Sequence, residues 1–180
     1  MIVTNITSSA NFFHLMRRQV AWEFRKPCVV FSPKSLLRSS KVAAPIKDFT
    51  TGNFCEVYPD DFVVDSEVKK VIMCSGKIYF DLLDEQQKQK AKEVSIVRIE
   101  QLYPFPKKQL SVILKKYIKP KLIWVQEEPE NMGPWSYILR IAEDYEFALV
   151  ARKAASSPAT GFNKIHRVEQ EDLVNRAFKL

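Results

Sequence analysis

Glycine is scarce in this chain of 180 residues, which contains only four glycines and no glycine-rich loop. The phosphate-binding loop and the dinucleotide-binding G-x-G-x-x-G pattern both need several closely spaced glycines, because their backbones approach a phosphate. Neither pattern is present. The turn Ser75-Gly76-Lys77 follows an apolar run and contains a single glycine, so plain turn geometry is a better interpretation there than phosphate contact.

Cysteine and histidine are also few. Cys28, Cys55 and Cys74 lack the spacing of metal ligands, and we interpret them as reduced thiols of an intracellular protein. The two histidines, His14 and His166, have no partners at ligand spacing, so no metal site is predicted. No Ser-His-Asp order is suggested around them. His14 lies in an apolar segment, which predicts a packed and hydrogen-bonded side chain.

Long hydrophobic runs are absent as well, so we expect no transmembrane helix and no membrane association. The first residues, MIVTNITSS, lack the basic and apolar regions of a secretory signal. The net charge is +7, but the lysines lie on the polar face of one expected helix and beside turns. Aromatic residues do not interleave with them, so nucleic-acid binding is not expected.

The stretch from Val68 to Glu100 is the clearest structural unit in the sequence. An apolar run ends at Cys74, an amphipathic pattern extends from Lys77 to about Lys92, and a β-branched run follows at residues 94–99. Strand, helix and strand in this order predict a parallel β-α-β unit. The same alternation continues along the chain, with strands at residues 122–125 and 147–150 and helices at 107–118, 136–143 and 169–178. The fold class is therefore α/β.

The first forty residues repeat the pattern on a smaller scale. Strands are expected at residues 1–5 and 28–31, and a helix between them extends to about residue 24. Phe13, Met16, Val20 and Phe24 recur three or four residues apart, which predicts a buried apolar stripe. Turn and linker residues from Leu36 to about Asp65 indicate a domain boundary near residues 39–47.

Two groups of charged residues are candidates for binding or chemistry. The carboxylates Glu127 and Glu128 follow a strand end, where ligands bind in open parallel sheets. Adjacent residues on an extended segment point apart, so capping or an interdomain salt link is expected of them rather than acid–base work. The basic pairs Arg17-Arg18 and Lys107-Lys108 could hold a phosphorylated ligand, although a solvated surface is the simpler interpretation.

Seven motifs stand together in order and carry a resemblance to a known family. They are NFFHLMRRQ, KPCVVFSPKSLLR, KVIMCSGKIYFDLL, IVRIEQLYPFP, WVQEEPENMGPW, SSPATGFNKIH and DLVNRAF. In this order they resemble the C-terminal part of the thiamine-diphosphate-dependent component of the 2-oxoglutarate dehydrogenase complex. The resemblance covers essentially the whole chain.

The resemblance implies a fold and a domain division. Residues 1–38 correspond to the tail of a pyrimidine-binding α/β domain, residues 39–67 to an interdomain linker, and residues 68–180 to a transketolase-like C-terminal domain. That domain is a three-layer α/β/α sandwich with a mainly parallel sheet.

The resemblance also implies an oxidoreductase that works as a homodimer with dihydrolipoyl succinyltransferase and dihydrolipoyl dehydrogenase. The full-length enzyme uses thiamine diphosphate and Mg²⁺, in the cytoplasm of a bacterium or in the mitochondrial matrix of a eukaryote. The Gly-Asp-Gly…Asn motif that binds the cofactor's diphosphate and metal is not in this chain. We therefore expect a fragment that has no catalytic residue of its own, binds no cofactor alone and is inactive by itself.

The family also implies a regulatory nucleotide site for AMP or acetyl-CoA. The positions that match it here are Arg17, Arg18, Ser32, Gln101 and Lys108. Asn53 and Glu56 stand where the actinobacterial form has Lys and Ser, and Gln109 replaces a basic residue. The lost positive charge weakens attraction for phosphate, so acetyl-CoA activation is in doubt while a weaker nucleotide site remains open.

Two alternatives stay open at the level of the sequence. The relative that acts on 2-oxoadipate has similar C-terminal motifs, and substrate choice resides outside this chain. A free-standing nucleotide-binding or interaction module of the same fold is the second alternative.

Overall fold

The structure is a computed structural model that describes residues 1–180. The first 67 residues form short elements, which are β1 (Ile2–Asn5), α1 (Ser9–Ala21), β2 (Cys28–Phe31), η1 (Leu36–Arg38), η2 (Ser40–Val42), α2 (Ile46–Thr50), β3 (Val57–Tyr58) and η3 (Asp65–Glu67). The remainder contains β4 (Lys70–Cys74), α3 (Ile78–Gln89), β5 (Val94–Ile99), β6 (Gln101–Tyr103), α4 (Lys107–Leu114), β7 (Lys121–Pro129), α5 (Trp135–Ile141), β8 (Phe147–Arg152) and α6 (Asn163–Lys179).

The larger sheet contains five strands in the order β3-β5-β4-β7-β8. The strands β5, β4, β7 and β8 are parallel to their neighbours, and only the short edge strand β3 is antiparallel. Four of the five residues of β4 are buried, as are five of the six residues of β5. Strands covered on both faces need such continuous apolar runs, which is why these runs were recognisable in the sequence.

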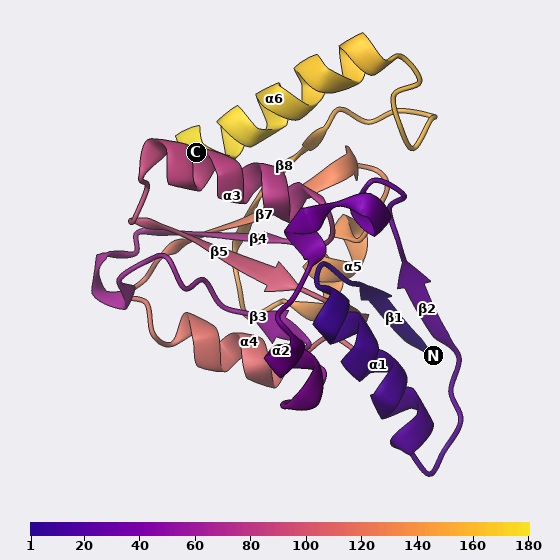
Figure 1. Ribbon diagram of the computed structural model, residues 1–180. Coiled ribbons are helices and arrows are strands. Elements are labelled where there is room, and N and C mark those ends of the chain that lie inside the picture. Colours follow the sequence, from indigo (N-terminus) through magenta and orange to yellow (C-terminus); the bar gives the residue numbers. More distant parts are fainter.

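Helices cover both faces of this sheet (Figure 1). One core cluster joins α4 and α5 to the sheet through Leu110, Ile113 and Ile138. The second cluster joins α3 and α6 to the opposite face and includes Ile78 and Leu173. The arrangement confirms the predicted three-layer α/β/α sandwich with a mainly parallel sheet.

A smaller sheet of three strands, in the order β2-β1-β6, lies beside the main sheet. β1 and β2 are parallel, whereas β6 pairs with β1 in the antiparallel direction. β6 directly follows β5 of the larger sheet, so the N-terminal strands are connected to that sheet through residues 99–103. The division into residues 1–38, 39–67 and 68–180 stays a prediction.

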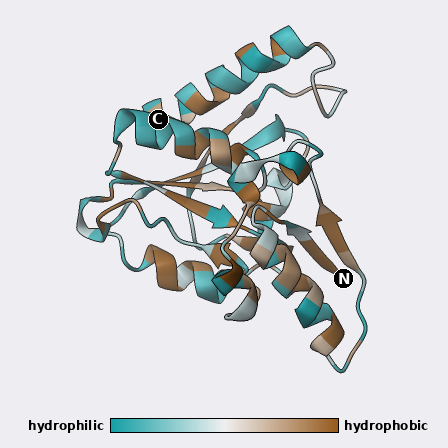
Figure 2. Ribbon diagram, viewed as in Figure 1, coloured by the Kyte–Doolittle hydropathy of each residue, from teal (hydrophilic) through white to brown (hydrophobic).

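The prediction of a buried apolar stripe on α1 was wrong. Phe13, Met16 and Val20 are exposed, Val20 to 78%, and Phe24 lies beyond the end of the helix, which stops at Ala21. The buried face is formed by Ala10, Asn11, His14 and Leu15. Its two polar residues, Asn11 and His14, hydrogen-bond to residues in distant segments. The face of α1 that is less apolar in sequence is therefore the one that packs inward. Figure 2 shows the mixed hydropathy of this helix.

The remaining differences concern the ends of elements. α6 begins at Asn163, before the predicted start at residue 169, and β7 continues through Gln126, Glu127 and Glu128 to Pro129. Serine before a helix can cap its first turn, but the side chain of Ser8, which precedes α1, makes no capping hydrogen bond. No helix has the length and apolar character needed to cross a membrane.

Candidate functional site

The order of the strands defines a crevice between β4 and β7. The chain passes from β4 through α3 to β5 on one side, and then through α4 to β7 on the other side of β4. The two connections diverge at the carboxyl ends of β4 and β7, and ligands of open α/β sheets bind at such a switch point.

A cavity of about 730 Å³ lies at this switch point. Its size falls within the usual range for small-molecule sites. The carboxyl ends of the parallel strands β1 and β2 meet the same cavity, so strand ends from both sheets are directed into it. Its polar lining residues are Asn5, Ser32, Ser75, Lys77, Gln126, Glu127 and Glu128, and its aromatic ones are Phe31, Tyr103, Trp124 and Tyr137.

Two glycines allow polar side chains to lie close to the backbone around this cavity. Gly76 has a φ of +77°, and a Cβ placed there would lie 2.3 Å from Nδ2 of Asn5. Gly133 has a φ of +68°, and its Cβ would lie 3.0 Å from Cβ of Glu128. Both glycines therefore serve as positive-φ turns and as close-approach points.

The charges in the cavity are unevenly paired. Lys77, which begins the turn into α3, donates to Glu127 Oε1, and Gln170 Nε2 donates to the same carboxylate at 2.8 Å. Glu128 lines the cavity and is half-buried, and its carboxylate has no hydrogen bond or ion pair. The two adjacent carboxylates have different surroundings, and neither forms the expected cap or interdomain link.

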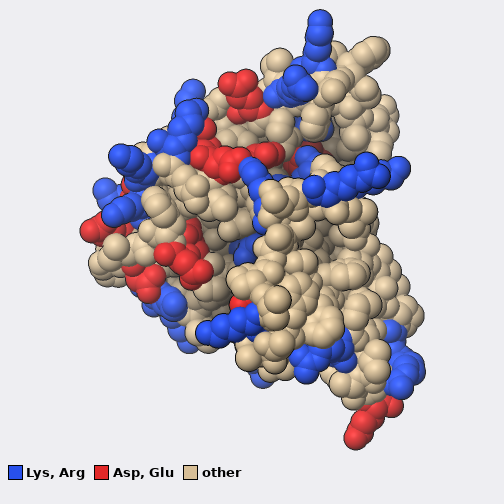
Figure 3. Space-filling model, viewed as in Figure 1, with Lys and Arg blue, Asp and Glu red and all other residues tan.

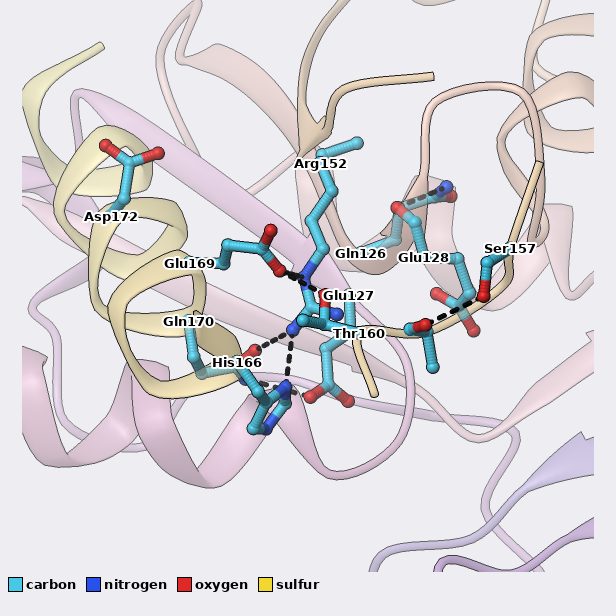
Figure 4. Close-up of polar contacts among 12 residues, drawn as sticks. Gln126, Glu127, Glu128, Arg152, Ser157, Thr160, His166, Glu169, Gln170 and Asp172 are labelled. Carbon is cyan, nitrogen blue, oxygen red and sulfur yellow. Dashed lines mark hydrogen bonds and ion pairs between the residues drawn. The ribbon is translucent and has the colours of Figure 1, made fainter. Parts of the chain in front are cut away.

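A polar network continues from Glu127 to the C-terminal helix (Figure 4). Arg152 at the end of β8 has a side chain that is only 9% exposed. Its Nη2 donates to Gln170 Oε1 at 3.0 Å and to His166 Nδ1 at 2.9 Å. Because Nδ1 accepts this bond, the neutral ring carries its proton on Nε2. The network ties α6 to the strand ends and uses up the hydrogen-bonding capacity of His166 on that side.

Arg18 is the centre of a second polar cluster, on α1. Its guanidinium donates to Glu56 Oε1 at 3.1 Å and to Gln101 Oε1 at 2.6 Å. The same group lies 4.1 Å from the ring centre of Phe54 and 4.7 Å from that of Trp22. Burial lowers the pKa of Arg18, and Glu56 opposes that shift. The predicted partners Arg18 and Gln101 are therefore in direct contact.

The other predicted positions lie apart from this pair. Arg17 borders a hollow of about 320 Å³ next to Arg18 and donates to His14 Nδ1 at 3.0 Å. Ser32 lines the switch-point cavity, and Lys108 lies in a different hollow with Lys107. The structure thus groups Arg17, Arg18 and Gln101, but it distributes Ser32 and Lys108 to other surfaces.

His14 matches its prediction of a packed and hydrogen-bonded side chain. It is 5% exposed, and its Nε2 donates to the carbonyl oxygen of Asp48 at 2.7 Å. The three cysteines are free thiols. Burial raises the pKa of Cys74 to about 12, and it also raises the pKa of Cys28 and Cys55. None of the thiols is a ready nucleophile at neutral pH, because the thiolate is the reactive form.

The structure also allows a test of the cofactor that the family resemblance implied. No three His, Cys, Asp or Glu side chains are grouped so that they could hold a metal ion. Mg²⁺ with a bound diphosphate is held by carboxylate and other oxygen ligands. The residues present here therefore do not fit the metal–diphosphate half of thiamine diphosphate.

The fold alone places this chain in a known structural class. Its arrangement resembles a solved split-gene transketolase described as an inactive beta4 tetramer, with a TM-score of 0.61 at 15% sequence identity. The match covers 99% of this chain and 57% of that one. The class is therefore that of transketolase-like α/β domains.

Residues 43–178 match the family described as 2-oxoglutarate dehydrogenase C-terminal, and the chain belongs to that family. It is 40% identical to the 2-oxoglutarate dehydrogenase E1 component of Cupriavidus necator, over 99% of this chain and 20% of that protein. It is also 40% identical to the mitochondrial 2-oxoglutarate dehydrogenase of Caenorhabditis elegans, over 98% of this chain and 18% of that protein. The chain thus spans about a fifth of the length of these curated relatives.

Proposed function

We propose that this chain supplies the C-terminal module of a 2-oxoglutarate dehydrogenase. In this role it contributes to an enzyme that decarboxylates 2-oxoglutarate with thiamine diphosphate and Mg²⁺, and that passes the succinyl group to dihydrolipoyl succinyltransferase. Dihydrolipoyl dehydrogenase completes the complex. The observation that carries the proposal is the 40% identity to named 2-oxoglutarate dehydrogenases over nearly the whole chain. The compartment is the bacterial cytoplasm or the mitochondrial matrix.

The module's role is assembly rather than chemistry. Large apolar side chains are exposed on α1 and β2, among them Met16, Val20, Val29 and Phe31. The face over β1 and β2 is mostly free of charged side chains, while Lys and Arg gather at its margins (Figure 3). Apolar surface of this kind marks protein–protein contacts, and it supports packing against the remainder of the enzyme and within its homodimer.

An activity assay tests the proposal directly. The chain alone, supplied with 2-oxoglutarate, thiamine diphosphate, Mg²⁺ and ferricyanide, should show no turnover. Addition of a C. necator E1 component truncated to remove the matched fifth should restore turnover. Turnover by the chain alone at the rate of an intact enzyme, or no complex with the truncated enzyme, would overturn the proposal. The same assay with 2-oxoadipate separates the two substrate alternatives.

A regulatory nucleotide site on the same module is the second part of the proposal. Arg17, Arg18 and Gln101 would hold the phosphate of AMP or acetyl-CoA, whereas Ser32 and Lys108 line other hollows and are not part of this site. The hollow beside Arg17, which is lined by His14, Trp22 and Asn53, supports this placement. The contact between Arg18 and Glu56 opposes it, because a phosphate must compete with that carboxylate for the guanidinium. We therefore expect AMP to bind more weakly than at an unpaired arginine.

Calorimetric titration with AMP and with acetyl-CoA measures this site. Arg17→Ala should abolish the heat of AMP binding, since Arg17, unlike Arg18, has no carboxylate partner. Arg25→Ala, which removes an exposed arginine beyond the end of α1, is the control and should leave binding unchanged. No heat with either nucleotide would remove the site from the proposal.

A further inference from the structure

The switch-point cavity contains hydrogen-bonding groups that the folded chain leaves unused. Gln126 has both ends of its amide occupied, since it accepts from Trp124 and Trp135 and donates to three carbonyl oxygens. Lys77 and Glu127 neutralise each other. Ser75 donates to the carbonyl oxygen of Ile99 at 2.8 Å. These groups are used to hold the fold together, so only the remaining polar groups of the cavity are available to a ligand.

The available set includes Glu128 and Asn5. The carboxylate of Glu128 makes no hydrogen bond within the chain, and the side-chain oxygen of Asn5 is buried without a partner. Each side chain is packed against a glycine of positive φ, which holds it beside the cavity. A carboxylate only accepts hydrogen bonds, whereas an amide can both donate and accept. The matching ligand must therefore offer a donor to the carboxylate and a donor–acceptor pair to the amide.

The walls of the cavity favour a flat ligand. Tyr103 and Tyr137 have ring centres 6.2 Å apart with a tilt of 56°, and both line the cavity together with Phe31. Tyr103 is 44% exposed, so its ring is accessible from solvent. Aromatic side chains stack on planar heterocycles regardless of their substituents.

The charge of the cavity argues against a phosphate. Its charged lining consists of one cation, Lys77, and two anions, Glu127 and Glu128. The cation is already paired with Glu127, so the unpaired charge that remains is negative. An anionic group would meet the Glu128 carboxylate and be repelled, because like charges disfavour each other at short range.

From these features we propose that the switch-point cavity binds an uncharged, amino-substituted nitrogen heterocycle of the adenine type. The exocyclic amine donates to Glu128. The ring edge pairs with the Asn5 amide, as Asn side chains pair with adenine in other settings. The ring itself lies against Tyr103 and Tyr137. This site is separate from the nucleotide site proposed at Arg17, and it selects a nucleoside rather than a nucleotide.

Calorimetry with adenosine and AMP, on the full chain, tests this site. Adenosine should bind, and Glu128→Gln should weaken that binding by roughly tenfold, since a charge-assisted hydrogen bond is lost. Glu130→Gln changes an exposed carboxylate two residues further along and is the matched control. Asn5→Ala is the second variant, and its binding should also fall. Circular dichroism melting of each variant separates lost binding from lost folding.

The two nucleotide sites give opposite patterns in these variants. Glu128→Gln should weaken adenosine and leave AMP unchanged, whereas Arg17→Ala should weaken AMP and leave adenosine unchanged. Adenosine binding that is absent at millimolar concentration, or equal in Glu128→Gln and wild type, overturns the cavity site. Adenosine binding that falls with Arg17→Ala instead overturns it as well, because the ligand then occupies the other hollow. None of these outcomes bears on the assembly role, which the activity assay decides separately.

Discussion

Gly76 and Gly52 separate two costs of replacing a glycine by alanine. One cost is a clash of the new Cβ with its neighbours, and the other is a strained backbone angle. Both glycines have a positive φ, but a Cβ at Gly76 would meet Asn5 while a Cβ at Gly52 would meet nothing within 4 Å. Gly52→Ala should lower the free energy of unfolding by about 1–2 kcal/mol, which is the strain of alanine in the left-handed backbone conformation alone. Gly76→Ala should cost roughly 1–3 kcal/mol more because of the clash. Urea denaturation measures both.

The double variant Asn5→Ala/Gly76→Ala isolates the steric part of that cost. Removal of the Asn5 amide frees the space that the new methyl group needs, so the double variant should be more stable than Gly76→Ala alone. The contradicting outcome is simple additivity. If adding Asn5→Ala to Gly76→Ala lowers the stability as much as Asn5→Ala does in wild type, the two residues do not compete for space.

Glu100 is a buried acid whose stability effect depends on pH. It is fully buried and accepts hydrogen bonds from Thr7, through its backbone and hydroxyl, and from the Asn11 amide. Burial raises the pKa of Glu100 above its ordinary value of 4.5, although Arg98 and the hydrogen bonds oppose the shift. The folded state therefore holds this proton more tightly than the unfolded state, and folding loses stability as pH rises above about 4.5.

Glu100→Gln removes that titration and keeps the shape of the side chain. Relative to this variant, wild type should lose stability as pH rises from 4.5 upward, and the loss should level off above the folded pKa. Urea denaturation of both proteins across pH 4.5–8 measures the difference, in which titrations common to both cancel. A difference that stays flat, or that grows in favour of wild type with rising pH, would contradict the raised pKa.

At the scale of elements, the exposed stripe on α1 should matter for association and not for folding. Val20→Ser should change the free energy of unfolding by less than about 0.5 kcal/mol, since Val20 is 78% exposed. Leu15→Ala, on the buried face of the same helix, should cost about 2–5 kcal/mol. Sedimentation velocity should show weaker association of Val20→Ser than of wild type. Equal losses of stability in the two variants would mean that the stripe is buried after all.

Sequence periodicity predicted the elements well where burial was uniform. β4, β5 and β7 were recognisable because strands covered on both faces are continuously apolar. The same reasoning failed on α1, since periodicity finds an apolar face but does not say what covers it. Asn11 lies on the buried face because its amide bonds Cys55 and Glu100, which are 44 and 89 residues away in sequence. Such long-range pairs leave no local signal.

At the scale of the whole molecule, the candidate site could not be assembled from local patterns. The predicted pair of Arg18 and Gln101 came from the family resemblance, and the structure brings the two into contact. The cavity combines strand ends from two sheets, and the relative position of those sheets depends on the pairing of β6 with β1. A single glycine at position 76 suggested a plain turn. The structure shows that Gly76 also leaves room for the side chain of Asn5, which packs against it.

The same cross-connections predict that the chain behaves as one folding unit despite its two sheets. Residues before position 68 complete the larger sheet in three ways. Asp60 accepts from the backbone N–H of Ile96 at 2.7 Å, β3 pairs with β5, and Thr7 and Asn11 satisfy the buried carboxylate of Glu100. Excision of residues 68–180 would expose or orphan these groups, and each lost hydrogen bond to a charged group contributes roughly 1.5–3 kcal/mol.

We therefore expect residues 68–180 alone to be less stable than the full chain by roughly 3 kcal/mol or more. The full chain should unfold in one transition that circular dichroism and tryptophan fluorescence report at the same urea concentration. Trp22 reports the N-terminal part and Trp124 the main sheet, so single-tryptophan variants can follow each part. Two separated transitions, with the second matching that of residues 68–180, would instead mean that the bonds to Glu100 and Asp60 do not couple the two sheets.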